Sequence, residues 1–249
     1  MFIIYILNMD AIILSGGFAK RLLPISEFIP KSLFPLGGKP ILDHIIQKLN
    51  AIGIRKIYIS TNKKFSDQFE YFISLRKNLD ISMIVEPTMA EEEKFGAIRG
   101  LAYALKQVNA DSYAVIAGDN YFDFDLLPLK KFFEDKGKNV LALYDIGSIE
   151  EAKKYGVVNI DDEFRIKNFK EKPKNPESTL ISTGIYMFNN KIQILIEKYL
   201  GEKNNPDQMG HLIEWLIKDD VVYGIPFKGR WYDIGTLEIY RYIFNNFSK

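Results

Sequence analysis

Along the first half of the chain, short apolar runs alternate with longer stretches in which apolar residues recur every three or four positions. The short runs predict buried strands, and the longer stretches predict helices with one apolar face. We expect strands at residues 10–14, 56–60, 81–85 and 113–117, and helices at residues 40–52, 65–77 and 94–107. This alternation predicts an α/β fold with a mainly parallel central sheet.

After residue 125, predicted strands become more frequent. We expect helices at residues 126–136, 191–199 and 209–218, strands at 140–144, 157–160, 164–169, 181–188 and 221–225, and a last helix through residue 247. No linker rich in Gly, Ser or Pro separates the two halves, so we expect a single domain over residues 9–249. Residues 1–8 are mostly apolar and precede the first strand, which predicts an N-terminal extension or an extra edge strand.

The first strand ends at Leu14 and leads into a loop that contains Gly16 and Gly17. Glycines let backbone N–H groups approach phosphate oxygens, because no Cβ stands in the way. Arg21 and Lys31 follow and supply positive charge, Arg as a planar fork and Lys as a point charge. A glycine turn alone is common in α/β proteins, but together with these cations it predicts a site for a nucleoside triphosphate.

Composition limits the classes of protein that the chain can represent. With 249 residues and 47% hydrophobic content, it can bury a substantial core. The net charge of +1 creates no overall field toward nucleic acid or an anionic membrane, so we expect neither as a partner. The absence of cysteine excludes disulfides and thiolate chemistry and is compatible with a reducing, cytoplasmic location.

Two aspartates stand where carboxylates could face bound phosphates. Asp119 follows the strand at 113–117, at the carboxyl end where open α/β sheets bind ligands, and Asp233 follows a short apolar segment near the C-terminus. Mg²⁺ prefers a few carboxylates together with phosphate oxygens and water. Taken singly, such an aspartate is also typical of a turn or a helix cap, so the pattern alone leaves both interpretations open.

The glycine loop resembles the opening of the sugar-nucleotide pyrophosphorylases, a family of sugar-1-phosphate nucleotidyltransferases with the pattern L-x-G-G-x-G-x-R-L-x-P followed by P-K-x-L. The chain matches this pattern at Gly16, Gly17, Arg21, Leu22, Pro24, Pro30, Lys31 and Leu33. It departs from the pattern at Ala19, where the family usually has a third glycine, and at Lys20, where a small hydroxyl residue is frequent. Ala19 restricts the loop if its φ angle is positive.

The resemblance extends over nearly the whole chain and implies a Rossmann-like three-layer nucleotidyltransferase fold with a mixed, mainly parallel sheet. It implies that an NTP and a hexose 1-phosphate react to give an NDP-sugar and pyrophosphate, by in-line attack of the sugar phosphate on the α-phosphorus. The motifs G-D-N and W-x-D-x-G-T imply that Asp119 and Asp233 bind Mg²⁺. Because the chain ends soon after the last motif, we expect a monofunctional enzyme. Members of the family often form dimers or tetramers, so the resemblance also implies a homo-oligomer.

The turn Glu171-Lys172-Pro173 is, by its residues alone, an exposed charged turn. It also resembles the E-K-P segment of the family, which implies that Glu171 accepts a hydrogen bond from a sugar hydroxyl and that Lys172 bridges the two reacting phosphates. Two further segments resemble sugar-site segments and contribute Gly156, Thr183 and Gly184. The predicted catalytic residues are Arg21, Lys31 and Lys172.

Glu86 stands where thymidylyl and uridylyl enzymes often carry Gln, and Gly96 follows in the same base-reading region. A carboxylate only accepts hydrogen bonds, which suits the N1–H and amino donors of guanine. The alternative is that Glu86 ends a strand in solvent and backbone groups read the base. The sequence leaves two substrate pairs open: GTP with mannose 1-phosphate, and dTTP or UTP with glucose 1-phosphate. The predicted nucleotide-binding residues are Leu14, Gly16, Gly17, Glu86, Gly96 and Asp119.

Three consecutive glutamates at residues 91–93 could be mistaken for a metal cluster. Thr88 and Glu91 have the spacing of a capping box, and acidic side chains suit the positive end of a helix dipole. The run therefore predicts the N-terminus of the helix at 94–107.

Two other functions remain compatible with the motifs. One is a cytidylyltransferase that acts on a non-sugar phosphate such as phosphocholine, which would need the loop and the aspartates but not the Glu-Lys-Pro turn. The other is a non-catalytic subunit that binds nucleotide sugars. A subunit of that kind is expected to lose Lys31, Lys172 or a metal aspartate, and all of them are present.

Overall fold

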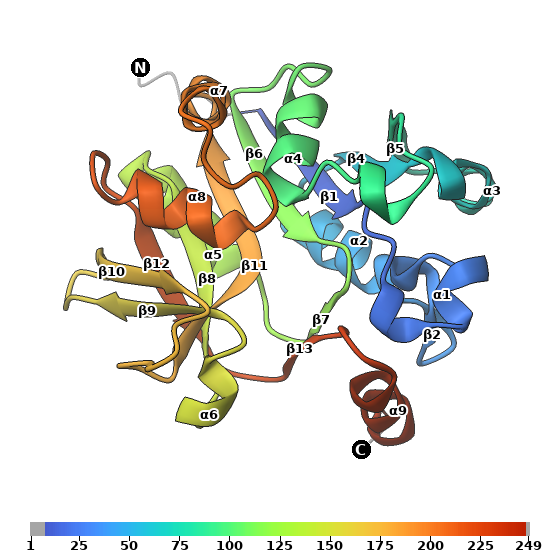
Figure 1. Cartoon of the computed structure of the whole chain (residues 1–249). Helices are drawn as coiled ribbons and strands as arrows, with labels where there is room; N and C mark the ends of the chain where they lie inside the picture. The colour runs from blue at the N-terminus through green and yellow to red at the C-terminus, as the bar shows by residue number, and fades with distance from the viewer. Residues whose placement is uncertain (1–7, 248–249) are drawn as a thin grey trace.

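The computed structural model of the protein describes residues 8–247 and shows a twisted sheet with helices on both faces (Figure 1). In this part of the chain nine strands form the sheet, in the order β10-β9-β11-β6-β1-β4-β5, with β8 and β12 branching from β11. These strands are β1 (Met9–Ser15), β4 (Lys56–Asn62), β5 (Asp80–Glu86), β6 (Ser112–Ala117), β8 (Val140–Asp145), β9 (Gly156–Ile160), β10 (Ile166–Glu171), β11 (Leu180–Asn189) and β12 (Tyr223–Phe227).

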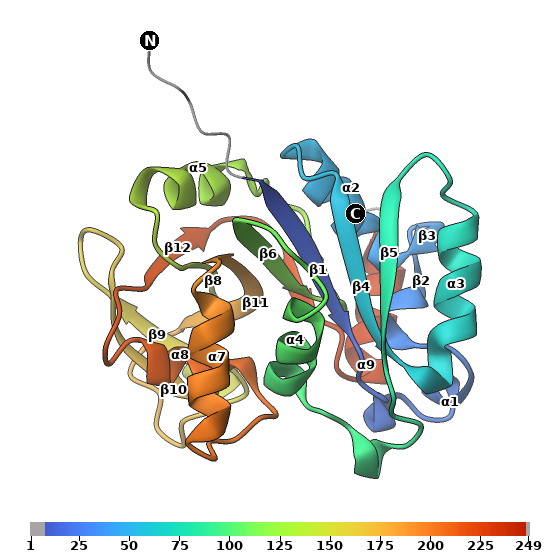
Figure 2. The ribbon, with the colours of Figure 1, turned by 90° about the horizontal axis from the view of Figure 1, so that it is seen from above.

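The two halves of the sheet differ in strand direction. β1 is parallel to both β4 and β6, and β5 is parallel to β4, so the glycine loop after β1 lies at the carboxyl edge of a parallel sheet (Figure 2). β11 is antiparallel to β6 and to β8, which extends the sheet into a strand-rich second half. The predicted mixed α/β fold is confirmed.

Helices cover both faces because alternate residues of each strand point to opposite sides. Ala11 and Ile13 pack on the face that carries α2, α3 and α5, whereas Ile12 packs on the face that carries α4, α7 and α8, and all three residues are fully buried. The helices are α1 (Ile25–Phe28), α2 (Ile41–Ala51), α3 (Ser66–Ser74), α4 (Ala97–Leu105), α5 (Leu127–Lys136), α6 (Ile149–Ala152), α7 (Ile192–Gly201), α8 (Met209–Leu216) and α9 (Leu237–Asn246).

Each strand and helix that the sequence predicts between residues 10 and 247 is present, with ends that differ by a few residues. The sequence did not predict the hairpin of β2 (Pro35–Leu36) and β3 (Lys39–Pro40), the short strand β7 (Asn120–Phe122), or the one-turn helices α1 and α6. These elements are two to four residues long, too short to show a hydrophobic period.

The predicted capping box at Thr88 and Glu91 is wrong. Residues Glu91–Glu93 form a separate 3-10 turn, and α4 begins only at Ala97, after Gly96. The first N–H groups of α4 are satisfied by distant backbone instead: Ala97 N donates to Asp207 O at 2.9 Å, and Ile98 N donates to Pro206 O at 3.0 Å. The cap of this helix is therefore a tertiary contact with the loop before α8.

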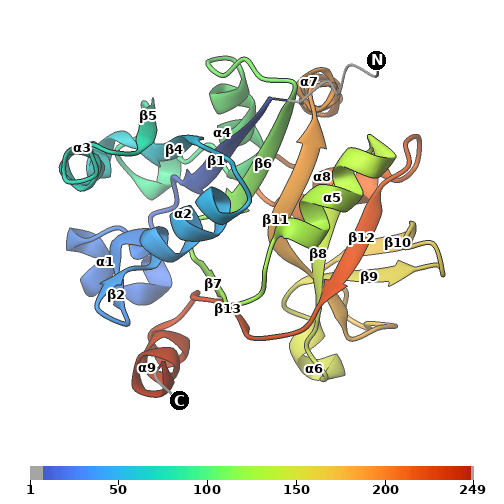
Figure 3. The same cartoon turned by 180° about the vertical axis from the view of Figure 1, so that it is seen from behind.

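A short antiparallel pair joins the middle of the chain to its C-terminal part. β13 (Trp231–Asp233) pairs with β7, so that Asp233 lies opposite Asn120. α9 then packs on a small core around Leu22, Phe34 and Leu36, beside the β2–β3 hairpin (Figure 3). This pairing brings the C-terminal motif to the glycine loop.

No helix within residues 8–247 has the length and apolar character needed to cross a membrane. The predicted extension or edge strand at residues 1–8 falls almost entirely outside the described residues, of which Asn8 precedes β1.

Gly96 and Gly38 form a matched pair for testing the contact between α4 and the loop before α8. Both have a positive φ angle, +78° and +81°. A Cβ at Gly96 would lie 2.6 Å from Asp207 Cα, whereas a Cβ at Gly38 would have no described atom within 4 Å. We expect Gly38→Ala to lower the free energy of unfolding by about 1–2 kcal/mol through backbone strain alone. We expect Gly96→Ala to lower it by roughly 3–5 kcal/mol, because overpacking adds to the strain. Urea denaturation measures both values, and equal losses would contradict a tight contact.

Candidate active site

The glycine loop leaves β1 and turns sharply at Ala19. Ala19 has φ 51° and ψ 44°, the left-handed conformation that a glycine adopts without cost. Its carbonyl accepts hydrogen bonds from Leu22 N at 2.8 Å and Ser26 Oγ at 2.9 Å, which hold the turn. The chain therefore keeps the left-handed turn although alanine occupies the position of the third glycine.

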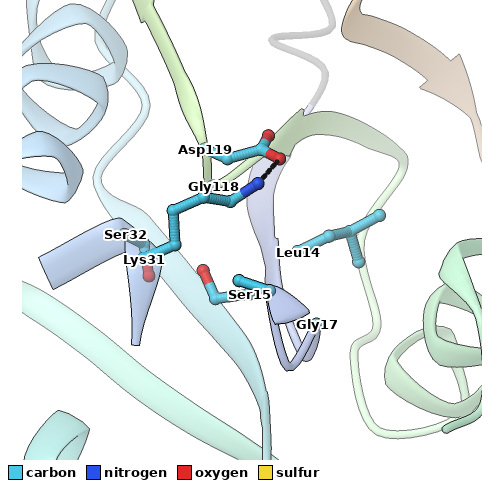
Figure 4. A pocket seen from close by; sticks show the side chains of 8 residues that line it. Leu14, Ser15, Gly17, Lys31, Ser32, Gly118 and Asp119 are labelled. Atoms are coloured by element: carbon cyan, nitrogen blue, oxygen red, sulfur yellow. Dashed lines mark hydrogen bonds and ion pairs between the residues drawn. The ribbon is translucent and has the colours of Figure 1, made fainter. Parts of the chain in front are cut away.

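Beside this loop lies a small cavity of about 80 Å³ (Figure 4). Lys31 reaches across it, and its Nζ donates to Asp119 Oδ2 at 2.5 Å (Figure 4). The cavity is lined by Leu14, Ser15, Gly17, Ala19, Lys31, Ser32, Gly118 and Asp119. Four of the predicted nucleotide or catalytic residues thus meet at one place.

The two predicted metal aspartates come together. Asp119 follows β6 and Asp233 ends β13, and the hydrogen bond from Ile234 N to Asp119 O at 3.0 Å ties the two segments. Burial, and next the charge of Asp119, raise the pKa of the Asp233 carboxyl to about 6, against the opposing charges of Lys31 and Arg21. Adjacent carboxylates that resist joint ionisation are a donor set that suits a hard divalent cation.

Glu171 and Lys172 lie at the end of β10. Lys172 has φ 45°, and its N–H donates to Tyr155 O at 3.0 Å, which holds this unusual backbone conformation. The Lys172 side chain is about half exposed, whereas the Glu171 side chain is 9% exposed, and their charged groups are 3.6 Å apart. Burial raises the pKa of the Glu171 carboxyl, and Lys172 acts in the opposite direction.

A second cavity, of about 1010 Å³, joins these groups. Its wall contains all the predicted sugar-binding residues, together with one predicted catalytic arginine and the two predicted metal aspartates. The predicted residues along its wall are Arg21, Asp119, Gly156, Glu171, Lys172, Thr183, Gly184 and Asp233.

Thr183 lines the cavity, but its hydroxyl is already bonded within the protein. Its Oγ1 donates to Ala142 O at 2.8 Å, and the residue is 1% exposed. The Thr183 carbonyl accepts from Asn120 Nδ2 at 2.6 Å and from Trp231 Nε1 at 3.2 Å. Thr183 therefore holds the wall of the cavity in place, and its hydroxyl is already bonded.

Glu86 and Gly96 are not among the described residues that line either cavity. Glu86 is 5% exposed, so the alternative of a solvent-exposed strand end is wrong. Its carboxylate accepts from Ser60 Oγ at 3.1 Å and lies under the glycine loop, so close that a Cβ at Gly16 would be 2.7 Å from Oε1. Burial raises the pKa of Glu86. Its role in reading the base stays a prediction.

The sequence did not point to Gln208, Met209 and Gly210, which line the large cavity at the start of α8. The sequence signal that could have indicated them is Gly210 in the first turn of the predicted helix, because a glycine inside a helix often marks a place where another group approaches the backbone closely. Here it admits Glu171: a Cβ at Gly210 would lie 1.7 Å from Glu171 Oε2.

Comparisons with known proteins agree with this geometry. Residues 10–249 match a family model described as nucleotidyl transferase. The chain is 36% identical over 247 residues to the bifunctional protein GlmU of Methanocaldococcus jannaschii, covering 96% of this chain and 55% of that protein. It is 33% identical to a Sulfolobus acidocaldarius protein assigned as a mannose-1-phosphate guanyltransferase, covering 91% of this chain and 60% of that protein. The chain thus spans a little over half the length of these two curated relatives.

A solved structure supports the same assignment. A Bacillus anthracis protein assigned as a glucose-1-phosphate thymidylyltransferase superposes with a TM-score of 0.83 and 26% sequence identity. The match covers 96% of this chain and 94% of that one. The predicted resemblance is therefore confirmed, and the chain belongs to the nucleotidyl transferase family.

Proposed function

We propose that this chain transfers a nucleotidyl group from an NTP to a hexose 1-phosphate and releases pyrophosphate. The observation that carries the proposal is that Arg21, Lys172 and the Asp119–Asp233 pair line one cavity, although they come from separate segments. A reaction between two polyanionic substrates needs this combination of cations and metal-binding carboxylates. The names of the relatives and the solved structure described above support the same class of reaction.

In the proposed reaction an ionised oxygen of the sugar phosphate attacks the α-phosphorus of the NTP. A new P–O bond forms while the bond from the α-phosphorus to the bridging oxygen breaks, and pyrophosphate leaves with the electron pair. The attacking oxygen is already ionised near neutral pH, so no strong general base is required. The protein has to align the two phosphates and to neutralise their charge.

Arg21 and Lys31 lie beside the glycine loop and would neutralise the triphosphate, while Lys172 would approach both reacting phosphates from the other wall. Asp119 and Asp233 would hold Mg²⁺, because their hard oxygens lie together, and burial and the charge of Asp119 raise the pKa of Asp233, a cost that a bound cation would offset. When bound, Mg²⁺ supplies neutralisation of phosphate charge.

The half-exposed side chain of Lys172, on the wall of the large cavity, leads to a prediction about turnover. We expect Lys172→Ala to lower kcat by roughly 100-fold to 1000-fold, because the charge that develops on the phosphates loses a fixed partner. NTP binding, measured by calorimetry, should change less than twofold. Lys170→Ala is the control, since Lys170 lies two residues earlier, on β10, and pairs with Glu214 at 2.7 Å. Near-normal turnover of a folded Lys172→Ala variant would refute this role.

The paired aspartates predict dependence on a divalent cation. We expect a chelator to abolish pyrophosphate release and added Mg²⁺ to restore it. Asp233→Asn should raise the Mg²⁺ concentration needed for half-maximal rate at least about tenfold, because one anionic ligand is lost. Asp123→Asn serves as the matched control: Asp123 lies at the far side of β7 and pairs with Arg230 at 2.8 Å. Unchanged Mg²⁺ dependence of Asp233→Asn would rule out a metal at this pair.

The substrates are to be identified by pyrophosphate release across five NTPs and the 1-phosphates of mannose, glucose, galactose and N-acetylglucosamine. We expect one strongly active combination. Activity with GTP alone would support Glu86 as a base reader, and Glu86→Gln should then weaken the preference for GTP because the amide adds a donor. No activity with any sugar phosphate but activity with CTP and phosphocholine would replace this proposal with the non-sugar cytidylyltransferase.

A further inference from the structure

The side chain of Gln208 lies between the Glu171 carboxylate and the Lys172 ammonium. It occupies the N-cap position of α8 and lines the large cavity. Its Nε2 donates to Glu171 Oε1 at 3.0 Å, and its Oε1 accepts from Lys172 Nζ at 3.1 Å. The orientation of the amide follows from these neighbours, because a carboxylate needs a donor and an ammonium needs an acceptor.

A neutral amide is the side chain that suits both charges. Asn and Gln carry a donor and an acceptor on one planar group, so Gln208 satisfies Glu171 and Lys172 together and leaves the net charge of the site unchanged. Without it the Lys172 ammonium, now 3.6 Å from Glu171, would be free to close on the buried carboxylate. The Glu171 side chain is 9% exposed, so water screens its attraction for the half-exposed Lys172 side chain only in part.

The carboxylate that Gln208 contacts is confined on its other side. A Cβ at Gly156 would lie 3.0 Å from Glu171 Oε2, and a Cβ at Gly210 would lie 1.7 Å from the same atom. Glu171 Oε2 is therefore seated between two glycines, and Oε1 faces the open side. Gln208 and Lys172 are the charged or polar contacts there.

The backbone that presents Gln208 is held by neighbouring elements. Asn205 O accepts from Tyr199 Oη at 2.8 Å, and Asp207 N donates to Asn205 Oδ1 at 2.9 Å. Asp207 O also accepts from Ala97 N at the start of α4. A side chain on a fixed backbone loses little entropy when it makes its two hydrogen bonds, so it can hold its neighbours in place.

We propose that Gln208 is a positioning residue for nucleotidyl transfer: bonded to both side chains, it keeps the Lys172 ammonium from closing further on the Glu171 carboxylate, so that the ammonium faces the sugar phosphate while the carboxylate faces a sugar hydroxyl. Gln208 acts through these two side chains. This inference rests on the proposed function, because it assigns the two groups their substrates.

The test compares steady-state kinetics of the wild-type chain with those of Gln208→Met and Gln208→Glu. Methionine keeps the length of the side chain and removes both hydrogen bonds. We expect kcat/KM for the sugar 1-phosphate to fall roughly 10-fold to 100-fold in Gln208→Met, since hydrogen bonds to charged groups are lost. KM for the NTP should change less than twofold. Gln208→Glu should lose more, because a second carboxylate would face Glu171.

A matched control is Gln193→Met, on the neighbouring helix α7, where the glutamine lines neither described cavity. It should retain wild-type kinetics. Thermal denaturation of all variants separates a loss of fold from a loss of positioning. If Gln208→Met does not fold, Gln208→Glu takes its place: the side chain has the same size but its carboxylate cannot donate to Glu171, and wild-type kcat/KM in this variant would likewise overturn the inference.

The pH dependence of kcat/KM gives a readout that a purely structural role would not change. The groups that face Glu171 are Gln208, Lys172 of the same turn, and His211 and Glu214 of α8. Removing a donor to the carboxylate disfavours its charged form and raises the pKa of Glu171, so the acid limb should move to higher pH in Gln208→Met.

The inference is overturned if folded Gln208→Met has wild-type kcat/KM for the sugar 1-phosphate. It is also overturned if KM for the sugar 1-phosphate and KM for the NTP change by the same factor. Both results would leave the proposed function intact, because the wild-type chain would still be active. A wild-type chain without transfer activity toward any sugar phosphate would instead overturn the proposed function and the role of Gln208 with it.

Discussion

The closeness of Asp119 and Asp233 is the constraint on which the rest of the site depends. Two carboxylates in a poorly solvated place repel each other, and burial makes this repulsion more costly. Strand pairing between β7 and β13 holds them together, and Lys31 supplies one compensating charge directly on Asp119. A fold that holds two carboxylates together creates a negative point that favours a cation, and the neighbouring Lys31 and Arg21, together with a bound cation, would then offset the charge of a polyphosphate.

The sheet explains why the site lies where it does. Parallel strands β1 and β6 end at one edge, so the glycine loop and Asp119 emerge side by side. The antiparallel extension through β11, β9 and β10 places Glu171 and Lys172 on the opposite wall of the same cavity. The two walls are also tied by the backbone hydrogen bonds between α4 and the loop before α8, so changes on the nucleotide side and on the sugar side are mechanically connected.

Two of the four described non-glycine residues with a positive φ angle lie at turns that line the cavities. Ala19 and Lys172 both have left-handed φ angles, which cost a non-glycine residue about 1–2 kcal/mol. In each case a backbone hydrogen bond holds the conformation, from Leu22 N to Ala19 O and from Lys172 N to Tyr155 O. The position of the lysine ammonium is thus set by the fold and not by the local preference of the chain.

The sequence by itself determined the order of strands and helices, the glycine loop with Arg21 and Lys31, and the aspartates and the Glu-Lys-Pro turn, because these signals lie in local periodicity and short motifs. Tertiary structure alone decided the β7–β13 pairing, the cap of α4 by residues 206–207, the burial of Glu86, and the place of Gln208 between Glu171 and Lys172. Each of these depends on contacts between segments far apart in the chain. Such contacts depend on how the whole domain packs, and a local sequence pattern contains no information about them.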